Sequence, residues 1–265
     1  METKRLDVYL AQNGFCRSRS LAAVLIKNKR VRVNGQTVCK TSYPISEDDR
    51  VCVDAAEETE FVGRGGKKLK KALAVFDISL TGCVCADIGA STGGFCDCML
   101  QNGAARVFAI DVGRGQLAAS LLADPRVVNL ENTNIRFLPD DLLPPVDFVS
   151  CDVSFISLSY VLPVIARLLK NGCGAVVLVK PQFEVGKELV GKNGIVKNPK
   201  LHRRVLESVM QQARQNGLAP VGLDYSPIWG GDGNREYLLY LQKSNGVGRE
   251  CFVVEQVVSD AFREL

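Results

Sequence analysis

Short apolar runs alternate with helical patterns along the chain from residue 83 onward. The runs are rich in valine and other residues that favour strands, and between them apolar residues recur at helical spacing. Such alternation predicts an α/β fold, with a mostly parallel seven-stranded sheet covered by helices on both faces. Because connections between parallel strands are right-handed, the loops after the strands gather at one edge, where ligands bind. The predicted strands are 84–88, 106–110, 126–130, 146–152, 174–180, 219–226 and 236–242.

The first part of the chain has a different pattern. Leu6 and Leu10 stand at helical spacing, and Ser18 can cap a second helix with its own apolar stripe. Asn34-Gly35 then lies between apolar residues, which predicts a hairpin because a type I′ turn needs positive φ at both central positions. The pattern predicts a small α+β unit of two helices and a hairpin, closing near 50–54.

The first quarter of the chain is basic. Residues 1–71 hold 15 lysines and arginines against 9 acidic residues, whereas the rest holds 18 against 20. A solvated helix face could be equally basic, but the charges gather around one predicted helix and its exit, which favours contact with nucleic acid. The candidate RNA-binding residues are Arg5, Arg17, Arg19, Lys27, Lys29, Arg30 and Arg32, together with Arg64 and Lys67 farther along.

These patterns divide the chain into four parts. We expect the basic domain at 1–58, and a linker at 59–66 in which acidic residues give way to Arg-Gly-Gly. The large domain then spans 67–245, and 246–265 form a tail whose apolar residues indicate a helix.

The sequence contains no run of about 18 apolar residues, which argues against a membrane-spanning helix. The first residues lack the apolar core of a signal peptide, and ten cysteines at irregular spacing indicate free thiols in a reducing compartment. We therefore expect a cytoplasmic protein without a membrane partner. The sequence does not indicate an oligomeric state.

A glycine-rich turn follows the first strand of the large domain. Its spacing is neither the dinucleotide fingerprint nor the P-loop. Asp87 at the strand end suits a cationic ligand, and Asp111 ends the next strand, where an acid can bind a ribose diol. S-adenosylmethionine carries an ammonium, a sulfonium and a ribose, so it fits both acids, although a turn without a ligand is the alternative. The candidate cofactor-binding residues are Asp87, Gly89, Ala90, Ser91, Thr92, Gly93, Gly94, Phe95 and Asp111.

Four cysteines bracket this turn in two Cys-x-Cys pairs, which raises the question of a metal site. Zinc sites usually use Cys-x-x-Cys pairs, often with histidine, and the sole histidine lies far away in the sequence. Cys96 and Cys98 would also lie roughly 200° apart on a helix, too far to chelate together. We interpret the four cysteines as core residues and expect no metal.

Charged residues stand at the predicted ligand-binding edge. Asp152 ends the fourth strand, Lys180 ends the otherwise apolar fifth strand, and Glu236 begins a strand predicted near the edge of the sheet. Each alone could be a solvated strand end, but together two acids and a lysine indicate a reactive site. His202 is predicted on a surface helix, in a structural role.

Two resemblances to known families add to this interpretation. The stretch SRSLAAVLIKNKRVRVNG, within residues 4–54, resembles an S4 domain, the small RNA-binding module of ribosomal protein S4 and several RNA-modifying enzymes. The chain as a whole resembles the TlyA (hemolysin A-like) family of ribosomal RNA methyltransferases, whose second domain is similar to the FtsJ/RrmJ ribose 2′-O-methyltransferases. The carrying motifs are GRGGKKL (63–69), DIGASTGGF (87–95), AIDVGRGQL (109–117), ENTNIR (131–136), DVSFISL (152–158), VKPQFEVGK (179–187) and GNREYL (233–238).

The resemblance, over about residues 4–242, implies a Rossmann-like domain that uses S-adenosylmethionine to methylate cytidine riboses in ribosomal RNA. It implies a catalytic tetrad and further cofactor contacts. Arg114 departs from the aromatic residue expected at its position in the family, and Gly63 from the expected serine. The tetrad falls on Lys68, Asp152, Lys180 and Glu236, and the further cofactor contacts on Val112, Asn132 and Asp152.

The chemistry of a ribose hydroxyl suits this set, because such a weak nucleophile needs a base or a stabiliser of its oxyanion. We expect Lys180 to act as the base, and Lys68 to lower its pKa by like-charge repulsion and to orient the RNA. Asp152 would orient Lys180 and the amino group of the cofactor, and Glu236 would position its neighbours.

Two other functions fit parts of the sequence. A ribosome-assembly factor could bind RNA through the front domain and retain a vestigial methyltransferase fold, although all four tetrad positions are present. A membrane-active haemolysin, as the family's older name suggests, would need an apolar or lytic segment that the sequence lacks. The expected partner is ribosomal RNA or a ribosomal subunit.

Overall fold

The computed structural model describes residues 4–16, 19–27, 29–46, 48–53, 60–230, 233–244 and 252–264. The chain divides into two units, Met1–Thr59 and Glu60–Leu265. The predicted linker and tail are placed differently, because residues 60–66 and the helix α9 (Val254–Glu264) belong to the second unit. Residues 54–59 lie outside the described part.

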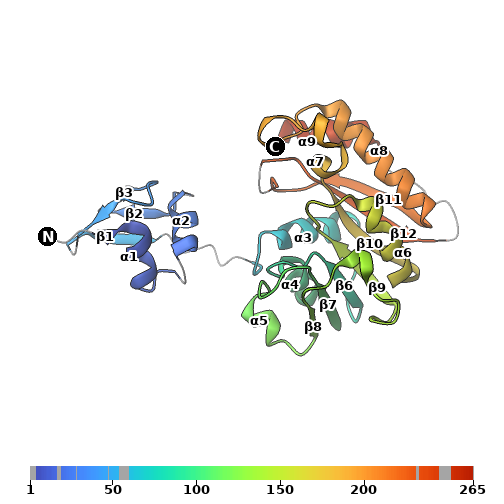
Figure 1. Cartoon of the computed structure of the whole chain (residues 1–265), viewed down its shortest axis with the longest axis horizontal. Coiled ribbons are helices and arrows are strands. Elements are labelled where there is room, and N and C mark those ends of the chain that lie inside the picture. Colours follow the sequence, from blue (N-terminus) through green and yellow to red (C-terminus); the bar gives the residue numbers. More distant parts are fainter. Residues whose placement is uncertain are drawn as a thin grey trace. The chain divides into compact units, whose positions relative to one another are not determined.

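The first unit contains the predicted pair of helices and the hairpin (Figure 1). Asn34 and Gly35 have φ values of 51° and 81°, which confirms the turn between β2 and β3. Leu6 and Leu10 of α1 pack with Ile26 of α2 in a core that the sheet completes. The elements are β1 (Lys4–Arg5), α1 (Leu6–Gln12), α2 (Arg19–Lys27), β2 (Val31–Val33), β3 (Gln36–Thr37), β4 (Pro44–Ile45) and β5 (Val51–Val53).

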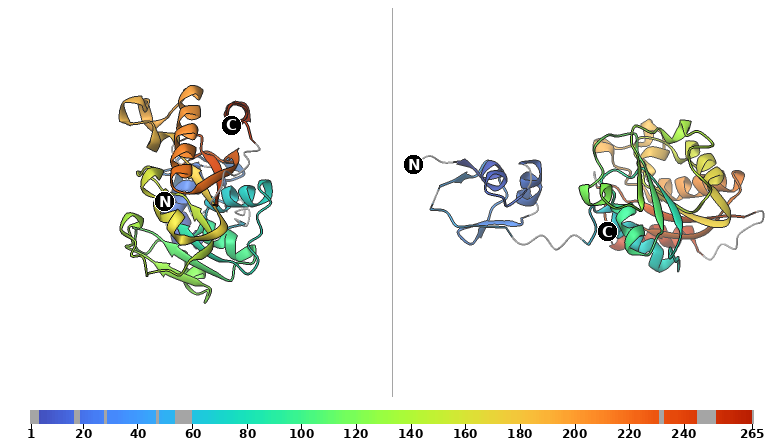
Figure 2. Two further views of the ribbon diagram at one scale, coloured as in Figure 1. Left: turned by 90° about the vertical axis from the view of Figure 1, so that its right-hand side faces the viewer. Right: turned by 90° about the horizontal axis from the view of Figure 1, so that it is seen from below.

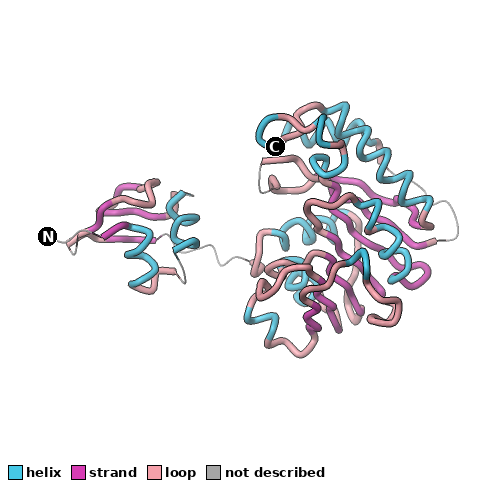
Figure 3. Tube along the Cα trace, viewed as in Figure 1, coloured by secondary structure: helices cyan, strands magenta, loops and turns pink. Residues whose placement is uncertain are grey.

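The second unit is built on a seven-stranded sheet of order β11-β12-β10-β9-β6-β7-β8. Figure 3 shows its strands in magenta with the helices in cyan around them. The neighbours from β10 to β8 pair in parallel, and β12 runs antiparallel to both of its neighbours. The predicted α/β class is confirmed. The strands are β6 (Val84–Ile88), β7 (Arg106–Ile110), β8 (Val127–Leu130), β9 (Val146–Cys151), β10 (Leu169–Val179), β11 (Leu218–Tyr225) and β12 (Tyr237–Lys243).

Helices cover both faces of this sheet, as two further views show (Figure 2). Alternate residues of each strand enter opposite cores, because successive side chains of a strand point to opposite faces. Cys85 packs with α3 and α4, whereas Ala86 packs on the side of α6, α8 and α9. The helices are α3 (Gly65–Val75), α4 (Gly94–Gln101), α5 (Ala119–Leu122), α6 (Leu162–Leu168), α7 (Pro181–Glu184), α8 (Pro199–Gln215) and α9, with short 3₁₀ turns at Ile135–Phe137, Leu158–Tyr160, Lys187–Leu189 and Lys192–Gly194.

The strand β12 lies between β10 and the edge strand β11, and so near the edge of the sheet as predicted. Its antiparallel direction has a consequence for the site. The start of an antiparallel strand lies at the same edge as the ends of its parallel neighbours. Glu236, directly before β12, is thereby brought to the edge at which Asp152 and Lys180 follow β9 and β10.

Glycines allow α3 to approach α4 closely. A Cβ on Gly94 would lie 2.9 Å from both the Gly63 carbonyl oxygen and the Gly66 nitrogen. A Cβ on Gly66 would lie 2.2 Å from Cγ of Phe61, which is 3% exposed. The Arg-Gly-Gly motif is therefore a packing surface, and it sets the position of the helix that carries Lys68.

A buried carboxylate lies beneath the glycine-rich turn. Asp87 is 1% exposed, and it accepts hydrogen bonds from Ser150 Oγ at 2.8 Å and Cys96 Sγ at 3.0 Å. Burial raises the pKa of Asp87 from 3.8 to about 6, although the two hydrogen bonds oppose this shift.

We expect Gly66→Ala to destabilise the protein by about 1–3 kcal/mol, because the new methyl group requires Phe61 or the helix to move. Gly65→Ala is the matched control, since it has the same helix propensity and its Cβ would lie 3.3 Å from Phe95. Urea unfolding measures both. Equal stability of the two variants would contradict the packing role of Gly66.

We expect Asp87→Asn to remove a pH dependence of stability. The folded protein binds the Asp87 proton more tightly than the unfolded chain, so this stabilising contribution is complete below about pH 4 and is lost as pH rises through about 6. The free energy of unfolding of the wild type, relative to Asp87→Asn, should fall by about 3 kcal/mol between pH 4 and 8. Urea unfolding across this range measures it, with Asp141→Asn, at an exposed position, as control. Parallel curves for wild type and Asp87→Asn would contradict the prediction.

Candidate active site at the carboxyl edge of the sheet

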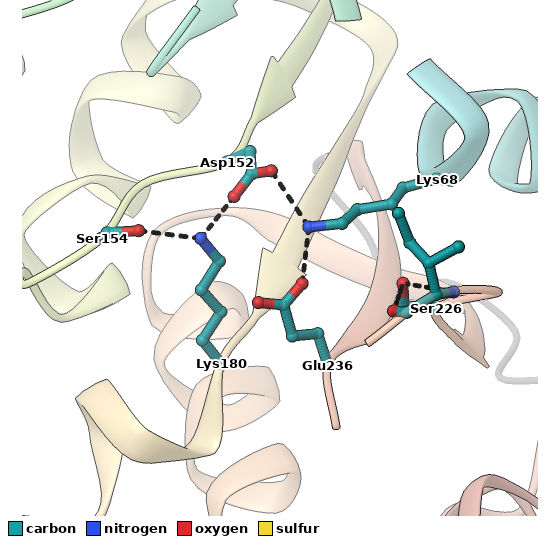
Figure 4. Close-up of polar contacts among 7 residues, drawn as sticks. Lys68, Asp152, Ser154, Lys180, Ser226 and Glu236 are labelled. Carbon is teal, nitrogen blue, oxygen red and sulfur yellow. Dashed lines mark hydrogen bonds and ion pairs between the residues drawn. The ribbon is translucent and has the colours of Figure 1, made fainter. Parts of the chain in front are cut away.

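Four charged side chains from four parts of the chain meet at the carboxyl edge of the sheet (Figure 4). Lys68 Nζ lies 2.6 Å from Glu236 Oε2 and 3.3 Å from Asp152 Oδ2. Lys180 Nζ lies 2.5 Å from Asp152 Oδ1. Asp152 therefore stands between the two lysines, and all four residues that the family resemblance indicated lie in one network.

This network is almost closed to solvent. Lys68, Lys180 and Glu236 are 7%, 8% and 3% exposed. Burial raises the pKa of Asp152, but attraction and hydrogen bonds from the two ammonium groups outweigh it, and the pKa lies below its usual value. Two cations face two anions, so the buried charges compensate one another.

Ser154 joins the network, although the sequence analysis did not select it. Lys180 Nζ donates a hydrogen bond to Ser154 Oγ at 3.0 Å. A single serine three residues after the end of β9 forms no sequence pattern of its own, and its proximity to Asp152 in the sequence was the available signal.

Two adjoining hollows open beside the charged network. The smaller, of about 220 Å³, and the larger, of about 670 Å³, share Gly89, Ser91, Asp152 and Ser154. Lys180 and Asp152 thus border the smaller hollow, and Asp152 stands where the two meet. The smaller hollow is also lined by Gly65, Ala90, Thr92, Gly94, Phe95 and Lys180.

The glycine-rich turn is fixed by its neighbours on both sides. Gly89 has φ of 82°, and a Cβ there would lie 2.5 Å from the Asp152 carbonyl oxygen. The Asp111 carboxylate accepts hydrogen bonds from the backbone nitrogens of Ser91 and Gly113, both at 2.7 Å. Asp111 therefore holds the turn in addition to lining the larger hollow.

Most predicted cofactor residues line one of the hollows, and three do not. Asp87 is buried beneath the turn, Gly93 directly precedes α4 with φ of 94°, and Asn132 is exposed on a loop. Direct contact of these three with a cofactor stays a prediction. The larger hollow is lined by further residues that the sequence analysis did not select: Gln116, Thr133, Asn134, Ile135, Arg136, Phe155 and Tyr160.

Aromatic side chains stand at the rim of the larger hollow. Phe155 is 89% exposed, its ring lies 5.0 Å from that of Phe183, and its φ of 64° is rare for a residue with a side chain. The Arg136 guanidinium lies 4.4 Å from the Tyr160 ring. The spacing of apolar residues in the sequence predicts helices and strands, but it does not predict this aromatic rim, because the rim is formed by loops.

The predicted RNA-binding residues differ in their surroundings. Asp7 is 5% exposed and pairs with Arg5 at 3.0 Å and Arg19 at 3.3 Å, and the hydrogen bond from Arg5 leads in lowering the pKa of Asp7 to about 2. These two arginines therefore stabilise the first unit as well. Lys27, Lys29, Arg32, Arg64 and Lys67 are exposed, Arg30 is partly buried, and Arg17 lies outside the described residues.

His202 is fully buried in α8, not on the surface as predicted, because it faces the sheet. Its Nε2 donates to the Val196 carbonyl oxygen at 2.8 Å, so its Nδ1 accepts from the Tyr237 hydroxyl at 2.8 Å. Burial lowers the pKa of His202. These contacts give it the structural role that was expected.

The cysteines around the glycine-rich turn are part of the apolar packing. Cys85, Cys96 and Cys98 are 0% exposed within one apolar core, and Cys83 packs beside it. In the part of the chain that the structure describes, no three His, Cys, Asp or Glu side chains are arranged to hold a metal ion. Nor does any helix in that part have the length and apolar character needed to cross a bilayer.

Comparison with known proteins places the chain in a family. The profile of the FtsJ-like methyltransferase family matches residues 61–243, and that of the S4 domain matches residues 4–51. The 16S/23S rRNA (cytidine-2′-O)-methyltransferase TlyA of Mycobacterium tuberculosis is 43% identical over 98% of this chain and 97% of its own.

Two other relatives carry the name hemolysin. Hemolysin A of Brachyspira hyodysenteriae is 39% identical over 89% of this chain and 98% of its own. The solved structure of a hemolysin-type protein from Streptococcus thermophilus has a TM-score of 0.79 and 41% identity, and it covers 100% of this chain and 97% of its own. With both domain profiles in order and a full-length relative of known class, the chain belongs to the TlyA family of methyltransferases, in which an S4 domain precedes an FtsJ-like catalytic domain.

Proposed function

We propose that this protein transfers a methyl group from S-adenosylmethionine to the ribose 2′-hydroxyl of a cytidine in ribosomal RNA. The observation that carries the proposal is the joining of Lys68, Asp152, Lys180 and Glu236 beside two adjoining hollows. The name of the Mycobacterium tuberculosis relative supports the same reaction and the same nucleotide. An RNA substrate of this kind would be met in the cytoplasm.

The residues of the two hollows fit S-adenosylmethionine. The larger hollow has an acid, Asp111, and apolar walls from Ile110 and Ile135, which suit a ribose and an adenine. The smaller has glycine backbone and the carboxylate of Asp152, which suit an amino-acid portion with positive charge. When bound, S-adenosylmethionine supplies the methyl group on a sulfonium.

The network then acts on the RNA hydroxyl. During methyl transfer from the bound cofactor, the ribose hydroxyl would lose its proton to Lys180, whose ammonium group pairs with Asp152 in this structure and would first have to release a proton to solvent. Asp152 holds Lys180 at 2.5 Å, and Glu236 holds Lys68 at 2.6 Å, so each lysine is aligned by a carboxylate. Alignment of the oxygen with the methyl group supplies much of the rate, because the reacting atoms must approach in line.

The S4 domain supplies the first contact with the RNA. Its exposed Lys27, Lys29 and Arg32 can bind phosphates, while Arg64 and Lys67 extend basic charge along the start of the catalytic domain. Whether the substrate is free RNA or an assembled subunit is decided by which of the two is labelled in the assay below.

We expect Lys180→Ala to abolish methyl transfer while S-adenosylmethionine still binds. The assay mixes the protein with radiolabelled S-adenosylmethionine and either free ribosomal RNA or ribosomal subunits, and maps the labelled nucleotide. Lys180→Arg separates two roles, because arginine keeps the positive charge but does not accept a proton at neutral pH. A base predicts inactivity of both variants, whereas an electrostatic stabiliser predicts partial activity of Lys180→Arg.

The control for this experiment is Lys200→Ala, an exposed lysine at the start of α8. Full activity of Lys180→Ala would contradict the role of Lys180. If the wild type labels no RNA yet binds it tightly, the protein acts as an RNA-binding assembly factor and the proposed reaction is wrong.

We expect deletion of residues 1–59 to weaken RNA binding and to flatten its dependence on salt. Each phosphate contact that is lost lowers the slope of log affinity against log salt by about 0.7 to 0.9. Filter binding at several salt concentrations measures the slope, and circular dichroism shows that the remaining unit, which has its own cores, is folded. An unchanged slope would mean that the S4 domain does not anchor the RNA.

A further inference from the structure

Glu184 joins two segments that leave the sheet beside each other, one after Asp152 and one after Lys180. It is the last residue of α7, and its carboxylate reaches the loop that follows Asp152. Its Oε1 accepts a hydrogen bond from the Leu158 backbone nitrogen at 2.8 Å, and its Oε2 accepts one from Ser157 Oγ at 2.7 Å. The carboxylate therefore ties together two segments that are 26 and 27 residues apart in the sequence.

The same two segments are held together nearer the reactive centre. Lys180 contacts Asp152 Oδ1 at 2.5 Å and Ser154 Oγ at 3.0 Å. Farther out, the ring of Phe183 lies 5.0 Å from that of Phe155. The bonds of Glu184 form the outer end of this series of contacts, so they limit how far the segments can separate.

The loop between Asp152 and Leu158 needs such a support. Phe155 within it has φ of 64°, a left-handed conformation that persists only where surrounding contacts enforce it. Ser154 and Ser157 line the larger hollow, and Ser154 also lines the smaller one. If the far end of the loop were released, relaxation at Phe155 would move Ser154 away from Lys180.

Partial burial of Glu184 also distinguishes it from a fully exposed surface acid. Burial raises the pKa of Glu184, and the hydrogen bonds from Leu158 and Ser157 oppose this shift. Glu184 lines neither hollow among the described residues, so it has no direct contact with a ligand there. Both hydrogen bonds of this half-buried carboxylate go to the loop, which points to a role in holding the loop.

We propose that Glu184 is a positioning residue for methyl transfer, which fixes the loop after Asp152 against the segment after Lys180. The proposal rests on the proposed function, because its readout is the methyl-transfer rate. It differs from a purely structural cap of the 3₁₀ turn Leu158–Tyr160, which would stabilise the fold without affecting the rate of the folded enzyme.

The test compares wild type, Glu184→Ala and Glu184→Gln in the labelled methyl-transfer assay, at a temperature well below the Tm of each. Glu184→Ala should lower kcat about 10- to 100-fold, because a shift near 1 Å in an active site can have that effect. KM for RNA and the Kd for S-adenosylmethionine should change by smaller factors. Glu184→Gln should regain part of kcat, since its amide oxygen can accept from Leu158 and its NH₂ can donate to Ser157 Oγ.

A second comparison keeps the proposal testable if Glu184→Ala folds poorly. Ser157→Ala removes one of the two donors, and in the Glu184→Gln background it should lower kcat less than it does in the wild type, because a neutral amide makes a weaker hydrogen bond with Ser157 than the carboxylate does. Glu207→Gln, an exposed acid on α8 that pairs with Arg203, is the matched control.

The proposal is overturned if kcat of folded Glu184→Ala lies within about twofold of the wild-type value. It is also overturned if the substitution changes only KM or the Kd of S-adenosylmethionine. Fully additive effects of the Ser157 and Glu184 substitutions on kcat would overturn it as well. Inactivity of the wild type itself would instead contradict the proposed function, so the two failures are distinguishable.

Discussion

The buried network of Lys68, Asp152, Lys180 and Glu236 constrains the rest of the catalytic domain. A charge taken out of water is stabilised only if an opposite charge and hydrogen bonds meet it, and removal of one partner from such a pair typically costs about 3–5 kcal/mol. Lys68 and Glu236 are 168 residues apart in the sequence, yet they must come within 2.6 Å. The antiparallel course of β12 and the close packing of α3 on α4 are the features that satisfy this requirement.

The same backbone that carries the charges also supports the glycine-rich turn. The Asp152 nitrogen donates to the Ile88 carbonyl oxygen at 2.9 Å, and Gly89 lies directly against the Asp152 carbonyl. A side chain at Gly89 would separate the turn from the strand end. Because the turn borders the two hollows and Asp152 borders both, this contact fixes the turn relative to the charged network.

Local patterns predicted the elements well, since side-chain periodicity reports directly on strands and helices. The start of β6 and the turn at Asn34-Gly35 are examples. The four tetrad residues were predicted from the resemblance to family motifs. The position of Lys68 in the sequence does not by itself show that its side chain faces Glu236.

Features that depend on tertiary approach could not be predicted in this way. Ser154 and Glu184 make their contacts only because two loops distant in the sequence meet. The burial of His202 depends on which face of α8 packs on the sheet. The antiparallel direction of β12 likewise follows from strand pairing over long range, which periodicity along one strand does not contain. Loops carry the parts of the site that sequence patterns describe least.

Ser154 gives a physical guide to how the network can receive its substrate. Its hydroxyl oxygen lies 3.0 Å from Lys180 Nζ while Asp152 holds the same ammonium group. Lys180 can therefore contact an alcohol oxygen without losing its carboxylate partner, and a ribose hydroxyl offers the same chemical group. Replacement of the Ser154 hydroxyl by a ribose hydroxyl would exchange one neutral group for another, so the charges of the buried network would stay paired. Displacement of Asp152 would instead leave the charge of Lys180 uncompensated. Under the proposed function, a substrate hydroxyl could therefore take the place of the Ser154 hydroxyl beside Lys180 while Asp152 keeps its partner.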